Sequence, residues 1–238
     1  MVLKKILLKI KIEIEYIQKR FDKETVRNEK ISKIYIKKYL PDNPVIIDAG
    51  ANDGSDSIEM SRLYSKKARI FAIEPLPSVF MQLQRNIRRY KNIKAFSIAL
   101  SNKNGEQELH VSSGASIGSS SLLKPDTHLQ DHPDVLFNER IKVQTMTLDE
   151  WAKENGINHV DFLWFDLQGF ELNVLKQSKI IFPTVKVVHM EVSTKNTYEG
   201  VTLYPEIKFW MEDHGFYLDK EAIPKGWDMG NVLFIRKN

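Results

Sequence analysis

Short apolar runs alternate with stretches of helical period along most of this 238-residue chain. The runs long enough for buried strands lie at 45–48, 69–74, 93–100, 160–166, 185–192 and 231–236. Apolar residues recur every three or four positions, as on one face of a helix, at 55–66, 78–90, 148–154, 170–177 and 204–214. Strands that alternate with helices of this length predict crossover units on a mostly parallel sheet, and therefore an α/β fold.

One long segment, residues 112–138, follows neither pattern. Its first ten residues contain six Ser and two Gly, and Pro125 and Pro133 lie in the remainder. This composition predicts a mobile loop. Because long loops in compact domains often serve as lids or binding loops, the segment is also a candidate for such a role.

The N-terminal residues have a helical pattern of their own. Residues 1–38 contain twelve Lys and Arg against five Asp and Glu, a net charge of +7, whereas the other 200 residues carry −3. We interpret residues 1–40 as a basic amphipathic helical arm and residues 41–238 as the domain. The arm could pair two copies of the chain or rest on an anionic membrane surface. Its apolar stripe consists of Leu3, Leu7, Ile10, Ile14, Ile17 and Phe21.

The composition excludes several classes of protein. The chain has no Cys, which excludes a disulfide scaffold, a Cys nucleophile, an iron–sulfur cluster and a thiolate zinc site. The 200 residues after residue 38 carry a net negative charge and therefore form a poor surface for nucleic acid. The sequence has neither an apolar run of ~18 residues nor a signal-peptide pattern. We expect a cytoplasmic protein without a nucleic-acid partner, in peripheral contact at most with the inner face of the membrane.

The turn after the first predicted strand is the most informative stretch. An apolar strand ends in Asp48 and runs into Gly50 and Gly54, after which a helix begins. Glycines at such a turn let the backbone approach a ligand, and the helix start offers free N–H groups. The turn departs from the G-x-G-x-x-G of a dinucleotide site, because Asn52 and Ser55 stand where that pattern needs Gly.

The charge at this turn favours a cationic ligand. Asp48 would repel a diphosphate, whereas it would attract the α-ammonium of S-adenosylmethionine, which also carries a sulfonium. Glu74, at the end of the second predicted strand, can accept hydrogen bonds from both ribose hydroxyls. We therefore predict an S-adenosylmethionine site, with a nicotinamide-dependent oxidoreductase as the alternative.

Several ordered blocks resemble the FkbM family of S-adenosylmethionine-dependent methyltransferases. The blocks are IDAGANDG at 47–54, FAIEP at 71–75, ALSNKNG at 99–105, SSSL at 119–122, TMTLDE at 145–150 and DFLWFDLQGFELNVL at 161–175. The resemblance covers roughly residues 45–192. It implies a class I methyltransferase fold, Rossmann-like, with helices on both faces of a seven-stranded sheet whose last strand is antiparallel. It also implies O-methylation, typically of a sugar hydroxyl in a surface polysaccharide or glycolipid, or of a natural product.

The resemblance also implies where the cofactor binds. By it, Asp48, Gly50, Asn52 and Glu74 hold the cofactor, and Ala99 and Leu100 border the adenine. The full predicted cofactor set is Asp48, Gly50, Ala51, Asn52, Gly54, Glu74, Pro75, Ala99, Leu100 and Asp166. The commonest family pattern has Lys at 164 and Glu at 168, where this chain has Trp164 and Gln168.

Methyl transfer to oxygen needs correct positioning and removal of the acceptor proton. Asp166 ends one predicted strand, and His189 and Glu191 share a face of the next, so the three could line one pocket. A general base at Asp166, His189 or Glu191 is one interpretation. A divalent cation such as Mg²⁺, held by Asp166 and Glu191, is another. Asp166 could instead only bind the cofactor, and His189 could be a core residue.

Three aromatic residues, Tyr198, Trp210 and Trp227, could stack on a sugar ring or belong to the core. We predict an S-adenosylmethionine-dependent O-methyltransferase with a glycan or glycolipid acceptor. The alternatives are the oxidoreductase and a non-catalytic, methyltransferase-like binding or scaffold domain.

Overall fold

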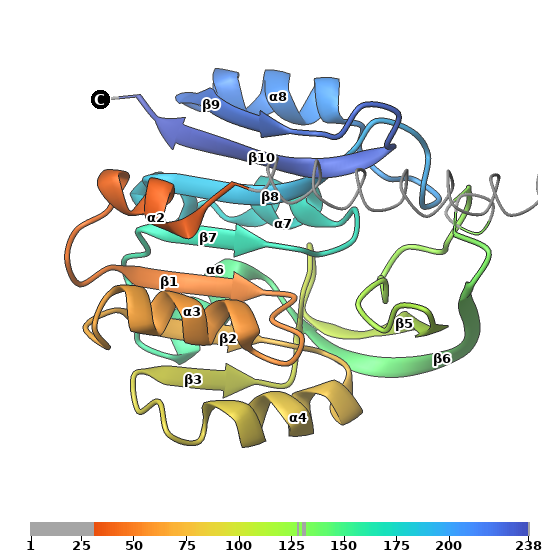
Figure 1. Ribbon diagram of the computed structural model, residues 1–238, viewed down its shortest axis with the longest axis horizontal. Helices are drawn as coiled ribbons and strands as arrows, with labels where there is room; N and C mark the ends of the chain where they lie inside the picture. The colour runs from red at the N-terminus through yellow and green to blue at the C-terminus, as the bar shows by residue number, and fades with distance from the viewer. Residues whose placement is uncertain (1–30, 128, 130–131, 238) are drawn as a thin grey trace, which may run out of the picture.

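The computed structural model describes residues 31–127, 129 and 132–237 (Figure 1). The helix predicted from the apolar stripe of the N-terminal arm lies outside these residues. No helix within the described ranges has both the length and the apolar character that a membrane span requires.

Seven strands of the described residues form one sheet in the order β3-β2-β1-β7-β8-β10-β9. Their bounds are β1 Val45–Ala49, β2 Arg69–Ile73, β3 Ile93–Phe96, β7 Phe162–Phe165, β8 Val187–Ser193, β9 Phe216–Ala222 and β10 Met229–Arg236. β1, β2, β3, β7 and β8 pair in parallel, whereas β10 is antiparallel to both of its neighbours. The expected sheet is confirmed, including its antiparallel last strand.

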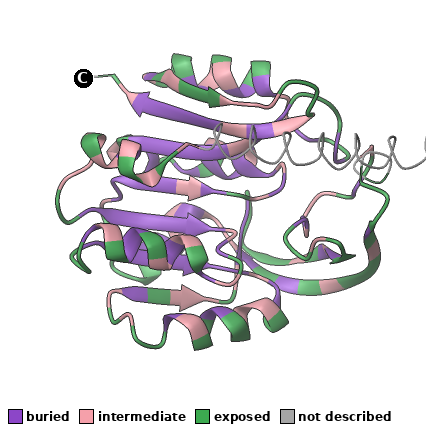
Figure 2. Ribbon diagram, in the orientation of Figure 1, coloured by how far each residue is buried: buried purple, intermediate pink, exposed green. Residues whose placement is uncertain are grey.

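Helices cover both faces of this sheet (Figure 1). α2 (Lys33–Ile36), the 3-10 turn η1 (Lys37–Tyr39), α3 (Ser55–Leu63) and α4 (Pro77–Ile87) contribute to one buried apolar cluster. α6 (Leu148–Glu154), α7 (Glu171–Gln177), the 3-10 turn η2 (Phe182–Thr184) and α8 (Tyr204–Asp213) contribute to the other. β1 is buried along its whole length because alternate side chains enter the two clusters (Figure 2).

A second sheet of the described chain contains three strands in the order β4-β6-β5. Its strands are β4 Ala99–Leu100, β5 Gly105–Gly114 and β6 Val135–Met146. The apolar run at 93–100 therefore divides between two sheets, which corrects the single strand expected there. The ends of the segment 112–138 also belong to strands. These residues were missed because β5 and β6 are mostly exposed and obtain their hydrogen bonds from each other.

The described end of the predicted arm, residues 31–40, packs on the domain. Ile36 is buried against α3, and the hydroxyls of Tyr35 and Tyr39 donate to Asp219 of β9 at 2.9 and 2.6 Å. Lys33 forms ion pairs with α3, at 2.6 Å from the Asp56 carboxylate. This short segment therefore connects one helical layer to the edge strand of the sheet.

Candidate active site

The turn after β1 lies against the end of β7. Gly50 has a φ of +80°, and its N–H and that of Ala51 both donate to the carbonyl oxygen of Ile73 at 3.0 Å. A Cβ added at Gly50 would lie 1.9 Å from the carbonyl oxygen of Asp166, the residue that follows β7. Glycine is therefore required for this approach, which brings the ends of β1 and β7 together.

Glu74 follows β2 and faces the same turn. Its carboxylate accepts hydrogen bonds from the N–H of Asn52 at 3.0 Å and from that of Leu76 at 2.9 Å. Burial raises the pKa of Glu74 to about 7, although these two N–H groups act in the opposite direction. Because each carboxylate oxygen has two lone pairs, Glu74 can accept further hydrogen bonds from a ligand.

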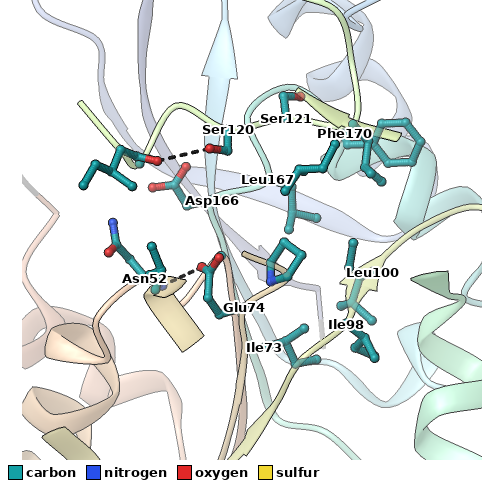
Figure 3. Close-up of a pocket in the computed structure, with 18 residues that line it drawn as sticks. Asn52, Ile73, Glu74, Ile98, Leu100, Ser120, Ser121, Asp166, Leu167 and Phe170 are labelled. Carbon is teal, nitrogen blue, oxygen red and sulfur yellow. Dashed lines mark hydrogen bonds between the residues drawn. The ribbon is translucent and has the colours of Figure 1, made fainter. Parts of the chain in front are cut away.

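Two cavities open at this edge of the sheet in the part of the chain that the structure describes. The first is narrow, about 60 Å³, with Asn52 and Glu74 on one side and Ile98 and Leu100 on another (Figure 3). A carboxylate beside an apolar slot suits a nucleoside, which needs acceptors for its ribose hydroxyls and apolar contacts for its base. This enclosed space is smaller than typical ligand sites, which measure ~300–1,000 Å³, and residues 117–122 form one of its walls.

That wall belongs to the Ser-rich segment, which is attached by hydrogen bonds. Ser112 Oγ donates to the carbonyl oxygen of Ile117 at 2.8 Å, and Ser121 pairs with His110 of β5. Ser121 Oγ also donates to the carbonyl oxygen of Gln168 at 2.9 Å. Composition predicted the loop, whereas its attachment to β5 and to the end of β7 depends on partners distant in the sequence.

Most of the residues predicted to hold the cofactor line the first cavity. They are Gly50, Asn52, Glu74, Pro75, Ala99, Leu100 and Asp166. Asp48, Ala51 and Gly54 lie behind the lining instead. Asp48 is 1% exposed, its Oδ2 accepts a hydrogen bond from Ser57 Oγ at 2.5 Å, and burial raises its pKa to about 7. The side chain of Asp48 is thus held by Ser57 of α3 and is not part of the cavity lining, and its contact with the cofactor stays a prediction.

Sequence reasoning missed the apolar part of this lining. It consists of Ile73, Val79, Ile98, Leu109, Ile117, Leu122, Leu167 and Phe170. Ile73, Leu122, Leu167 and Phe170 fall in blocks that resemble the FkbM family, which was their signal in the sequence. The others come from α4, the β3–β4 connection, β5 and the Ser-rich segment, whose meeting point is set by the tertiary structure.

Asp166 and Glu191 lie together, joined by Gln168. The amide nitrogen of Gln168 donates to Asp166 Oδ1 and to Glu191 Oε2, each at 2.7 Å, and its amide oxygen accepts from the Tyr198 hydroxyl at 2.8 Å. Burial raises the pKa of Asp166 to about 6. Burial, and then the charge of Asp166, raise the pKa of Glu191 well above its usual range. With a pKa of about 6, Asp166 is therefore the partner that loses its proton more readily, and Glu191 the one that holds a proton more strongly.

His189 lies away from both cavities. It lies two residues before Glu191 on β8, opposite Trp164 of β7, and its ring stacks on that of Trp164 at a centroid distance of 3.6 Å. Burial lowers the pKa of His189 to about 3, so the ring stays neutral. His189 and Glu191 share a face of β8, as expected. At His189, however, α2 covers this face, because Lys33 Nζ lies 4.5 Å from the centre of the Trp164 ring on which His189 stacks. The structure therefore does not bring His189 to the candidate site.

The second cavity is larger, about 620 Å³, and adjoins the first. Asp166 and Gly118 line both cavities. Gln168, Glu191 and Asn231 line the second cavity on the side of the main sheet. Its remaining lining comes from the β5–β6 connection, the loop after β8 and the β9–β10 turn: Ser116, Ser119, His132, Val135, Thr197, Ala222, Pro224, Gly226, Trp227, Asp228, Met229 and Gly230. An ionised carboxylate thus lies where the two spaces meet.

Comparison with known proteins identifies this arrangement. A model of the methyltransferase FkbM domain matches residues 48–218, which include both acids and the whole β1 turn. The chain belongs to the FkbM methyltransferase family. With the sheet order described above, it is a class I, S-adenosylmethionine-dependent methyltransferase.

Named relatives agree with this assignment. This chain is 34% identical over 163 residues to 2-O-methyltransferase NoeI of Sinorhizobium fredii, a match that covers 66% of this chain and 67% of NoeI. It is 28% identical over 224 residues to methyltransferase sdnD of Sordaria araneosa, with 83% of each chain covered. The fold is similar to that of methyltransferase FkbM from Methylobacillus flagellatus KT, at a TM-score of 0.52 and 15% identity, over 82% of this chain and 44% of that one.

The departures from the commonest FkbM pattern have visible consequences. Trp164, where Lys is common, forms the stack with His189, and Gln168, where Glu is common, donates to both acids of the site. Within the described residues, no group of three or more His, Cys, Asp or Glu is arranged to hold a metal ion. A divalent cation at Asp166 and Glu191 stays a prediction.

Replacing Glu74 with Gln is expected to weaken S-adenosylhomocysteine binding at least tenfold. The amide loses one of the acceptor oxygens that would serve the ribose hydroxyls, and hydrogen bonds to charged groups contribute about 1.5–3 kcal/mol. Isothermal titration measures the affinity. Glu171→Gln is the matched control, because Glu171 is also buried and also accepts from backbone N–H groups, at 2.8 Å from Leu167, but lies outside the lining. Equal affinity losses in the two variants would contradict the assignment of Glu74.

Proposed function

We propose that this protein is an O-methyltransferase that methylates a sugar hydroxyl of a polysaccharide or glycolipid. The position of Asp166, ionised and shared by both cavities, is the observation that carries the proposal. The first cavity would hold the cofactor and the second the acceptor. The relative named as a 2-O-methyltransferase supports oxygen as the atom that is methylated.

Each residue of the site has a separate role in the proposed reaction. When bound, S-adenosylmethionine supplies a methyl group activated by its sulfonium. Asp166 would accept the proton that the acceptor hydroxyl loses when it receives the methyl group. Glu191 would form a hydrogen bond with a neighbouring oxygen of the acceptor. Gln168 holds one oxygen of each carboxyl group and so leaves Asp166 Oδ2 and Glu191 Oε1 for the acceptor.

Cofactor binding uses the first cavity. Glu74 accepts from the ribose hydroxyls, while Ile98, Leu100 and Phe170 supply apolar contacts for the base. The close approach of Gly50 to Asp166 places the backbone of the β1 turn beside the base that accepts the proton. Binding and proton transfer therefore share one rigid edge of the sheet.

The pH dependence of turnover follows from Asp166. Its pKa is raised to about 6 by burial, and only the ionised form accepts a proton, so kcat/KM should fall as the pH drops through about 6. The measurement is kcat/KM between about pH 5 and pH 8, with residual turnover of Asp166→Asn as the control that lacks this limb. A profile that is flat through pH 6 would exclude Asp166 as the base.

The experiment that tests the function has two steps. Isothermal titration should show that S-adenosylhomocysteine binds and that NADH does not, which separates a methyltransferase from an oxidoreductase. Incubation with S-adenosylmethionine and a panel of glycans should then add the mass of one methyl group to an acceptor. A protein that binds S-adenosylhomocysteine but methylates no glycan in the panel would contradict the proposed function and favour a binding or scaffold domain.

A further inference from the structure

The structure separates the three aromatic residues that could contact a sugar ring. Trp210 is in α8, where its ring stacks on His214 at 3.8 Å and lies 5.3 Å from Phe182. Tyr198 is fully buried, with its hydroxyl 2.9 Å from the carbonyl oxygen of Ser119. Trp227 is 50% exposed and lines the second cavity. Of these three, Trp227 is the one that is both exposed and part of the lining of the second cavity.

Trp227 is held in place although it lies in a turn. The turn at 223–228 connects β9 and β10, at the side of the sheet where the second cavity opens (Figure 1). The N–H of Trp227 donates to the carbonyl oxygen of Pro224 at 2.9 Å. The next residue, Asp228, pairs with Lys195 at 2.8 Å and accepts at its carbonyl oxygen from the N–H of Thr194 at 2.7 Å. These contacts attach the turn to the loop after β8, so the backbone that carries Trp227 has a defined position beside the cavity.

The polar groups of the same cavity match a polyol. Asn231 of β10 pairs directly with Glu191 of β8 across the sheet, and both side chains line the cavity. Asn231 offers an amide donor and an acceptor, and Asp166 and Glu191 each keep one oxygen outside the Gln168 bridge. A pyranose has hydroxyls around its edge and C–H groups on its faces. The cavity thus provides polar partners for the edge and an aromatic face for the ring.

We propose that Trp227 is the platform on which a pyranose ring of the acceptor packs, with its hydroxyls directed toward Asp166, Glu191 and Asn231. The indole face carries partial negative charge and attracts the C–H face of the sugar. The surrounding carboxyl and amide groups favour this ligand over a flat phenol, which would leave most of them without partners. This inference rests on the proposed function and identifies Trp227 as the residue that favours a pyranose ring in the acceptor.

The test compares four proteins with one panel of acceptors. Wild type, Trp227→Ala, Trp227→Phe and Trp210→Ala are assayed with methyl glycosides and with p-cresol. For the glycosides that wild type methylates, Trp227→Ala should raise the acceptor KM about tenfold, and Trp227→Phe should recover most of this loss. The S-adenosylhomocysteine affinity should be unchanged in all variants. Trp210→Ala is the matched control, because its ring packs within the protein and its loss should leave the acceptor KM at the wild-type value.

A second measurement detects binding without turnover. Acrylamide quenches exposed indoles, and a bound glycoside should shield Trp227 in wild type but leave the quenching of Trp227→Phe unchanged. If wild type methylates a glycoside and Trp227→Ala has the same acceptor KM, this inference is wrong while the proposed function stands. If p-cresol is methylated and the glycosides are not, both are wrong.

Discussion

Replacing Asp166 with Asn is expected to lower kcat by about 10²–10⁴-fold, the usual contribution of a general base. Asn has the same shape, and its amide oxygen can still accept from Gln168, but it cannot take the proton of the acceptor. The backbone bond from Asp166 N–H to the carbonyl oxygen of Ala49, at 2.9 Å, is unaffected, so the protein should stay folded. Steady-state turnover with S-adenosylmethionine and a glycan that the wild-type protein methylates measures the effect.

The matched control is Asp161→Asn, at the opposite end of β7. Asp161 is also buried, accepts from the N–H of Val45 at 3.0 Å and pairs with Lys186 at 2.9 Å. This variant should lose stability but keep its kcat within about twofold, because it lies far from both cavities. Glu191→Gln should reduce kcat less than Asp166→Asn does. A larger loss in Glu191→Gln would make Glu191 the base, and full activity in Asp166→Asn would remove Asp166 from the chemistry.

Replacing Gly50 with Ala should destabilise the protein by about 2–5 kcal/mol and abolish cofactor binding. A positive φ of +80° costs a residue with a Cβ about 1–2 kcal/mol, and the new Cβ would lie 1.9 Å from the carbonyl oxygen of Asp166. Because that atom belongs to the backbone, the β1 turn and the end of β7 must separate, which costs about 1–3 kcal/mol more. Thermal unfolding should show a Tm lower by about 10 °C.

Gly156→Ala is the control for the effect of backbone conformation alone. Gly156 also has a positive φ, +64°, but a Cβ there would meet open space. We expect a loss of about 1–2 kcal/mol and a Tm lower by about 4 °C. Similar Tm values for the two variants would show that the contact between the β1 turn and Asp166 does not constrain the site.

The positions of Asp166 and Glu74 could be predicted because both follow apolar strands whose pattern is local. The carboxyl ends of parallel strands meet at one edge, so acids at two strand ends were expected to approach each other. Asp48 and His189 share the same local signals and yet lie elsewhere. Asp48 is within β1, where it accepts a hydrogen bond from Ser57 of α3, and His189 lies two residues before Glu191 on β8, against Trp164.

The contacts of Gln168 could not be predicted from the sequence. The sequence showed only that Gln168 departs from the commonest family pattern, and it gave no indication of the partners of its side chain. In the structure it donates to two carboxyl groups and accepts from Tyr198, a residue 30 positions further along the chain. Such a bridge depends on the approach of β7, β8 and the loop after β8, which no local pattern specifies.

By itself, the sequence determined the α/β class, the central strands and the glycine turn with acids at the strand ends. These features follow from side-chain period and backbone freedom within a few residues. The tertiary structure decided the division of 93–100 between two sheets, the pairing of β5 with β6 and the edge strand β9. It also decided which acids face the cavities and that Trp227, rather than Trp210 or Tyr198, faces the second one. Those outcomes depend on hydrogen bonds and burial between segments far apart in the chain, where the free energy of pairing exceeds any local preference.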